Sequence, residues 1–131
     1  MNKSNNMEKQ VIQEQRKNCP GIFYYPDTNE LELIGRSIPE NPEIIFRRLD
    51  DWITIHFEKN KDLGVTIQLE YINSGSSKYL YEILKRLTGF GRSGSTIRIK
   101  WLYEADDEAM LELGEHYRDT AGVPLEIELI A

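Results

Sequence analysis

Three serines, a glycine and an asparagine are concentrated in residues 73–78, which read NSGSSK. Residues 65–72 before them alternate between apolar and polar side chains and predict a strand, whereas residues 80–87 after them have helical apolar spacing. Asn and Gly tolerate the backbone angles of a tight strand-to-helix turn, and a serine hydroxyl can accept a hydrogen bond from the first helical turn. We therefore expect a hydroxyl-rich loop with Ser76 or Ser77 as the N-cap. It lies at the positive end of a helix dipole, where an anion such as phosphate can be held.

A hydroxyl in such a loop is also a candidate phosphoacceptor. Phosphorylation adds about −1.5 to −2 charges at pH 7. At a helix N-terminus this charge is tolerated without unfolding the domain, yet it changes the surface that a partner contacts. The same pattern is found at an ordinary capped helix, and the residues of the loop leave both interpretations open.

The composition restricts the class of protein. The chain has 131 residues, enough for one domain, and a formal charge of −6, which argues against a general nucleic-acid binder. No segment approaches the roughly 20 apolar residues of a membrane helix, and the first residues lack the apolar run of a signal peptide. Cys19 is the only cysteine, so an internal disulfide and a cysteine-rich metal site are excluded. We expect a cytoplasmic protein that binds neither membrane nor nucleic acid.

The apolar pattern predicts a hairpin of two strands followed by three helix–strand pairs. Residues 1–18 are polar and lack periodicity, so we expect a flexible tail before a domain of residues 19–131. The expected strands cover about residues 22–25, 30–34, 65–72, 97–103 and 125–129. The expected helices cover about residues 42–58, the segment from the serine loop to about Leu87, and the segment from Asp106 or Asp107 to Gly122.

The order ββαβαβαβ predicts an α/β fold with a mixed five-stranded sheet. A sheet covered on both faces would have nearly continuous apolar strands, but each later strand has one apolar and one polar side. We therefore expect helices on one face only, and an open face that carries Thr66, Gln68, Glu70, Arg98, Lys100, Glu126 and Glu128. Tyr71 is expected on the core side of its strand.

Three further patterns contain the residue types of a functional site, but the residues around them do not match such a site. Residues 89–94 (GFGRSG) match a dinucleotide-binding fingerprint, but they follow a helix and precede a strand, the reverse of the required order. Acidic residues 104–108 could hold a magnesium ion, yet acidic side chains also stabilise a helix start. His56, His116 and Cys19 lie in no recognisable nucleophile motif. We interpret the first pattern as a connecting loop and the second as a helix start, and we expect no cofactor, metal ion or catalytic group.

Three stretches resemble the SiaC family of bacterial regulatory phosphoproteins, small cytoplasmic domains similar to the STAS anti-sigma-factor antagonists. Residues 35–42 (GRSIPENP) are similar to the family's GRSYPENP segment, and residues 69–78 (LEYINSGSSK) to its LEYFNTSSSK segment. Residues 101–112 (WLYEADDEAMLE) are similar to its WYYEEDDEDMLE segment. The resemblance extends over residues 20–130, nearly everything but the tail.

The resemblance implies a switch rather than an enzyme, built on a single STAS-like domain. Family members are phosphorylated at the hydroxyl just after the asparagine of the loop, which is Ser74 here. A cognate serine/threonine kinase adds the phosphate and a PPM-type phosphatase removes it. In characterised systems the unphosphorylated form binds a diguanylate cyclase and promotes cyclic-di-GMP synthesis. Ser74, Gly75 and Ile38 stand where the family pattern has Thr, Ser and Tyr, and Gly75 is expected to loosen the loop.

The resulting hypothesis is a phospho-switch in which the Ser74 loop and the helix after it form the partner surface. Asn73 would shape the turn, Ser76 or Ser77 would cap the helix, and Lys78 would lie near the phosphate. Two alternatives remain: a small enzyme that binds a phosphorylated metabolite at the same helix start, and an interaction scaffold that pairs with another chain through the open sheet face.

Overall fold

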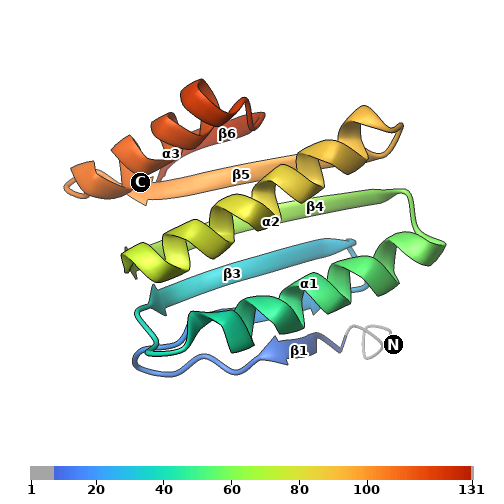
Figure 1. The fold of residues 1–131 in the computed structure, drawn as a ribbon, viewed down its shortest axis with the longest axis horizontal. Helices are drawn as coiled ribbons and strands as arrows, with labels where there is room; N and C mark the ends of the chain where they lie inside the picture. The colour runs from blue at the N-terminus through green and yellow to red at the C-terminus, as the bar shows by residue number, and fades with distance from the viewer. Residues whose placement is uncertain (1–7, 131) are drawn as a thin grey trace.

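The computed structural model describes residues 8–130, which form six strands and three helices (Figure 1). The strands are β1 (Gln10–Gln13), β2 (Gly21–Tyr25), β3 (Glu30–Ser37), β4 (Asp62–Ile72), β5 (Thr96–Glu104) and β6 (Leu125–Ile130). The helices are α1 (Pro42–Lys59), α2 (Ser74–Arg92) and α3 (Glu108–Ala121). The predicted α/β class and the alternation of helices with the later strands are confirmed.

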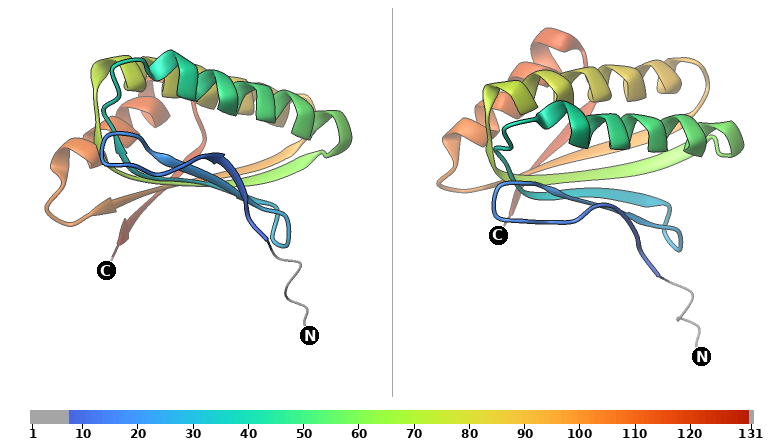
Figure 2. Two further views of the ribbon diagram at one scale, coloured as in Figure 1. Left: turned by 90° about the horizontal axis from the view of Figure 1, so that it is seen from below. Right: turned by 60° about the horizontal axis from the view of Figure 1, so that its bottom comes forward.

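The six strands lie in the sheet in the order in which they occur in the chain. β1, β2 and β3 are antiparallel neighbours, whereas β3 to β6 are parallel and are joined by the three helices. Crossovers of one hand that each advance by one strand place their helices on the same face. Figures 1 and 2 show the three helices on one face of the sheet and no helix on the other, as the alternating strands predict.

β1 lies within the segment 1–18 that is expected to be a flexible tail, so the sheet has six strands and not five. Val11 is the Cα partner of Phe23 in β2, and the guanidinium of Arg48 on α1 donates to Gln13 Oε1 over 2.6 Å. A strand this short offers too few apolar residues for a periodic pattern, so its pairing is not visible in the sequence. Residues 1–7 of the expected tail lie outside the described residues.

The core lies between the helices and the sheet face that they cover. Most inward positions predicted from helical spacing are buried, and Leu49, Ile53 and Leu84 have no exposed surface. Trp101 of β5 is also fully buried, and its indole Nε1 donates to the Met110 carbonyl of α3 over 2.9 Å. The indole thus fills the layer between β5 and α3 and satisfies its one polar atom.

α2 continues to Arg92, beyond the end predicted near Leu87, so the prediction of a connecting loop at residues 89–94 is wrong for residues 89–92, and residues 93–95 connect α2 to β5. Phe90 in this extension stacks on Phe57 of α1, with ring centroids 4.1 Å apart. Packing between the two helices offsets the cost of roughly 1 kcal/mol for each glycine in a helix interior. Residues 89–92 of the glycine-rich run therefore form the end of a helix, which is not the geometry of a dinucleotide-binding loop.

A bulge near the end of β4 reverses the predicted direction of Tyr71. The register between β3 and β4 shifts at Gly35/Arg36, which pairs Arg36 with Tyr71 and leaves Glu70 as an extra residue in β4. Such a bulge re-aims the side chains beside it. Tyr71 is therefore 58% exposed, with the Arg36 guanidinium 4.7 Å from its ring centroid, and Ile72 packs against the core instead.

Candidate functional site

The serine loop is the junction between β4 and α2, and its asparagine caps the helix. Asn73 has extended backbone angles, and its Oδ1 accepts a hydrogen bond from the Ser76 amide over 2.9 Å. Asn73 is therefore the N-cap, and Ser74 is the first helical residue. The expectation that Ser76 or Ser77 caps α2 is wrong, because the helix already begins at Ser74.

Asn73 also joins the loop to the segment between β3 and α1. Its backbone amide donates to the Ser37 carbonyl over 2.9 Å, and its Nδ2 donates to the Pro39 carbonyl over 3.2 Å. Gly75 lies against Pro42, since a Cβ on this glycine would be 3.3 Å from the proline Cγ. Gly75, which the sequence suggests would loosen the loop, therefore lies in the first turn of α2 and allows the starts of α1 and α2 to approach closely.

The three hydroxyls of the loop have different surroundings. Ser74 is exposed to solvent. Ser76 has no exposed surface, and its hydroxyl has no hydrogen-bond partner among residues 8–130. Ser77 is half-buried, and its hydroxyl is bonded to the Tyr117 hydroxyl of α3 over 2.7 Å. Of the three, Ser74 is the residue that another protein can reach without disturbing the start of α2.

Tyr117 fixes the start of α2 to α3. In addition to its contact with the Ser77 side chain, its hydroxyl donates to the Ser77 carbonyl over 2.9 Å. Burial raises the pKa of the Tyr117 hydroxyl above its usual value, and the hydrogen bond with Ser77 acts in the opposite direction. The hydroxyl is therefore protonated near neutral pH and remains a donor, so the helix start keeps this anchor.

A hollow of about 290 Å³ lies beside Ser74, between the start of α2 and the end of α3. α2 contributes Lys78 to its lining and α3 contributes His116, and no acidic side chain is among the described residues that line it. The positive end of the α2 dipole and the Lys78 ammonium both favour negative charge here. A phosphoryl group on Ser74 would therefore meet positive charge and not repulsion.

A groove of about 450 Å³ lies on the other side of α2, against α1, and no motif in the sequence indicated it. It is lined by Glu43, Phe46, Arg47, Asp50, Tyr79, Glu82, Ile83 and Arg86. The rings of Phe46 and Tyr79 are stacked with centroids 6.1 Å apart, and Arg86 forms a 2.7 Å ion pair with Asp50. The one indication of this groove in the sequence was Tyr79, an aromatic residue that directly follows the serine loop and precedes the apolar residues 80–87 of α2.

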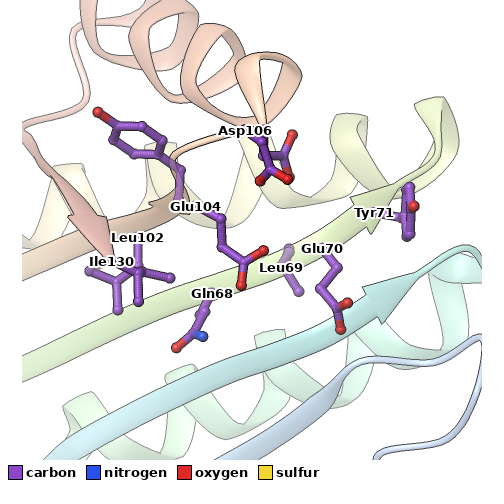
Figure 3. Close-up of a pocket in the computed structure, with 10 residues that line it drawn as sticks. Gln68, Leu69, Glu70, Tyr71, Leu102, Glu104, Asp106 and Ile130 are labelled. Carbon is purple, nitrogen blue, oxygen red and sulfur yellow. The ribbon is translucent and has the colours of Figure 1, made fainter.

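A hollow of about 270 Å³ lies on the open face of the sheet, at the ends of β4 and β5 (Figure 3). Glu70, Glu104 and Asp106 contribute carboxylates to its lining. Within residues 8–130, no group of three or more histidine, cysteine or carboxylate side chains is arranged to hold a metal ion. Asp107 has the predicted helix-start role, because its carboxylate accepts from the Met110 amide over 3.0 Å as the N-cap of α3.

The structure does not bring the histidines and the cysteine together. His56 is buried on α1, stacks on Trp52 with centroids 4.7 Å apart, and has its Nε2 3.0 Å from the Asp62 carbonyl. His116 is exposed on α3, and Cys19 lies between β1 and β2. His56 is therefore a packing residue that is satisfied by a backbone carbonyl.

Asn73→Ala is expected to lower the free energy of unfolding by about 1–2 kcal/mol, because it removes the cap of the Ser76 amide and the bond to Pro39. Asn73→Ser is the matched control, since serine can cap the helix but cannot reach Pro39 with a second donor. We expect it to lose less stability in urea unfolding followed by circular dichroism. Equal losses for the two variants would contradict a capping role for Asn73.

The fold and this site define a class of protein: a small α/β domain that presents a capped, hydroxyl-bearing helix start at its surface. Over residues 13–130 the chain matches the family described as SiaC family regulatory phosphoprotein. The chain belongs to this family, and the resemblance found in its sequence motifs is confirmed.

Two solved structures of relatives share the fold over nearly their whole length. SiaC of Pseudomonas aeruginosa is 25% identical with a TM-score of 0.82, and the match covers 95% of this chain and 100% of that chain. A chain in the crystal structure of the diguanylate cyclase SiaD in complex with its activator SiaC, from the same organism, is 24% identical with a TM-score of 0.84, covering 92% and 99%. An uncharacterised protein of Pseudomonas aeruginosa strain UCBPP-PA14 is 28% identical over 113 residues, which are 86% of this chain and 90% of that protein. None of the helices within residues 8–130 has the length and apolar character needed to cross a bilayer.

Proposed function

We propose that this chain is a non-enzymatic phospho-switch whose state is set at Ser74. A partner serine/threonine kinase adds the phosphate in the cytoplasm, a PPM-type phosphatase removes it, and the unphosphorylated form binds an effector. One observation supports the choice of residue above the others. Ser74 is exposed at the first helical position, whereas Ser76 is fully buried and Ser77 is bonded to Tyr117.

A diguanylate cyclase is the effector that we propose. The support comes from similarity, because this chain has the fold found in the complex of SiaD with its activator SiaC. We propose that the contact surface comprises the first turns of α2, with Lys78 on the side of α3 and Tyr79 on the side of α1. Ser74 lies at the beginning of this surface, so a partner that covers the helix start also covers Ser74.

The physical basis of the switch is the cost of desolvating charge. A phosphoryl group brings about −1.5 to −2 charges at pH 7, and it can remain hydrated at the exposed end of α2 in the free protein. A docked partner would have to remove that water, and burial of an unpaired charge is strongly unfavourable. Lys78 and the helix dipole stabilise the phosphorylated free form, which shifts the balance further away from the complex.

Peptide mapping of the chain purified from its own host tests the site. We expect a fraction of molecules to carry one phosphate, located on the peptide that contains Ser74, and this fraction to disappear after treatment with a PPM-type phosphatase. Phosphate on Ser77 or another residue, with Ser74 never modified, would contradict the assignment. Host cells that carry Ser74→Ala provide the matched control, because every other hydroxyl of the loop is retained.

A further inference from the structure

The face of the sheet opposite the helices is covered by no other part of the described chain (Figure 2). Charged side chains occupy most positions of this face on β3 and β5. Both salt bridges in the described part of the chain, Arg86–Asp50 and Arg118–Asp119, lie on the helices. No charge of the open face therefore forms a salt bridge within residues 8–130, although Glu126 of β6 is the Cα partner of Lys100.

The register of the three central strands sorts these charges by sign. Across β3, β4 and β5, the first two rows of the open face are Glu30–Gly64–Arg98 and Glu32–Thr66–Lys100. In both rows the residue on β3 is acidic, the residue on β5 is basic, and the residue on β4 between them is uncharged. Adjacent strands are about 4.8 Å apart, so β3 and β5 are roughly 10 Å apart within one chain, too far for an ion pair.

The next two rows continue the pattern, with the charges exchanged at the end. In the third row, Ile34 of β3 is the partner of Gln68 of β4. Because the preceding residues Ile67 and Trp101 are partners, Leu102 is the β5 residue of this row. The fourth row has Arg36 on β3 and Glu104 on β5, with the bulged residues of β4 between them. Figure 3 shows the Glu104 carboxylate reaching from β5 toward Gln68 and Glu70 of β4. The four rows on β3 are thus acidic, acidic, apolar and basic, and those on β5 are basic, basic, apolar and acidic.

We propose that the open face binds a second copy of this chain, related to the first by a two-fold axis that runs along β4. Such an axis places β3 of one copy over β5 of the other and keeps each row opposite the same row. The facing pairs are then Glu30 with Arg98, Glu32 with Lys100, Ile34 with Leu102, and Arg36 with Glu104, each formed twice. Each of these pairs between β3 and β5 joins opposite charges or two apolar side chains, whereas β4 faces its own copy and sets Glu70 opposite Glu70. The strands run in similar directions, as in aligned sheet packing.

The ends of the face extend the same complementarity. A hollow beside β3 is lined by Arg16, Lys17 and Arg36, with Glu70 as the one carboxylate among its described residues. The hollow beside β5 is lined by Glu70, Glu104, Asp106 and Asp107 among others, with no basic residue from the described part of the chain. Both hollows lie where the parallel strands end, so the two-fold axis sets the basic flank of one copy against the acidic flank of the other. Because the pattern is complementary to itself, it favours a second copy over an unrelated protein.

Solvent-exposed ion pairs are weak and are screened by salt, so we expect a reversible dimer that dissociates as ionic strength rises. Sedimentation equilibrium of the full-length chain at several salt concentrations measures this directly. Lys100→Glu and Glu32→Lys are each expected to weaken the dimer roughly tenfold, because each reversal replaces two attractive contacts by two repulsive ones. Lys59→Glu and Glu58→Lys make the same charge changes at exposed positions of α1 and are expected to leave the dimer unchanged.

Mixing the two weakened variants gives the sharpest test. In a mixed dimer the charge at position 32 of each copy again faces an opposite charge at position 100 of the other. The mixture is therefore expected to form heterodimers with the affinity of the original chain. A chain that is monomeric at every concentration and salt, single reversals without effect, or a mixture that stays monomeric while both variants retain their circular dichroism would each overturn the proposal.

Discussion

Ser74→Ala is expected to bind the effector with unchanged affinity and to be refractory to the kinase, whereas Ser74→Asp is expected to fold normally and lose affinity at least roughly tenfold. Alanine removes one hydroxyl, and the Ser74 side chain is exposed to solvent. Aspartate adds a charge that the partner must desolvate, and a tenfold loss corresponds to only about 1.4 kcal/mol. An authentic phosphoserine should cost more, because it carries nearly twice the charge of aspartate.

The measurement is the cyclic-di-GMP output of the host's diguanylate cyclase titrated with each variant. Ser93→Asp is the matched control, since it places the same charge at an exposed position at the other end of α2. We expect the control to activate as the original chain does. If Ser74→Asp and Ser93→Asp are equally active, Ser74 does not lie in the contact surface. If Ser74→Ala alone is inactive, the hydroxyl itself contributes to binding and the switch is not electrostatic.

Gly114→Ala is expected to lower the free energy of unfolding by about 1–3 kcal/mol, although alanine is the better helix former. Gly114 lies within α3 over the indole of Trp101, and a Cβ there would be 2.6 Å from Trp101 Cδ1 and Nε1. The indole is fully buried and is held by its bond to the Met110 carbonyl, so it cannot move aside at low cost. The helix would have to shift, and α3 forms one wall of the hollow beside Ser74.

Gly89→Ala is the matched control for this prediction. Gly89 is also inside a helix, but a Cβ at this position would meet no atom within 4 Å. We expect the variant to gain about 0.5–1 kcal/mol, because alanine loses less backbone entropy on folding. Thermal and urea unfolding of both variants provide the comparison. A gain for Gly114→Ala similar to that of Gly89→Ala would show that the contact between α3 and Trp101 is looser than the structure indicates.

The arrangement of helices over one face of the sheet was predictable because the apolar residues of each helix and strand repeat with a characteristic spacing. Leu49 and Ile53 repeat at helical spacing, and β4 alternates from Val65 to Leu69, so the face that each element buries can be read before any tertiary contact is known. One-sided alternation in successive parallel strands was enough to predict helices on one face of the sheet. These features depend on local spacing alone.

The features that were missed depend on contacts between distant residues. Tyr71 turns outward because the register of β4 against β3 shifts, and a bulge has no signature in one strand read alone. α2 extends over its glycines because Phe90 stacks on Phe57 of another helix. β1 is a strand because β2 offers it an edge, which its own four residues do not reveal.

At the site, the sequence predicted a capped helix start but not the separate environments of its serines. Asn73 and serine are almost equally good N-caps, so propensity did not choose between them. The choice depends on where β4 ends and on the bonds from Asn73 to Ser37 and Pro39. The burial of Ser76 requires knowledge of the fold, because it depends on the direction in which the first turn of α2 faces the sheet.

The central claim is that a phosphate on Ser74 weakens binding of the effector. The most direct test uses a chain into which phosphoserine has been incorporated at position 74 during synthesis. Calorimetry then compares the affinity of the effector for this chain with its affinity for the unmodified chain. We expect tight binding by the unmodified chain and at least a tenfold loss of affinity for the phosphorylated chain, with the same circular dichroism for both forms. Equal affinity of the two folded forms would contradict the account.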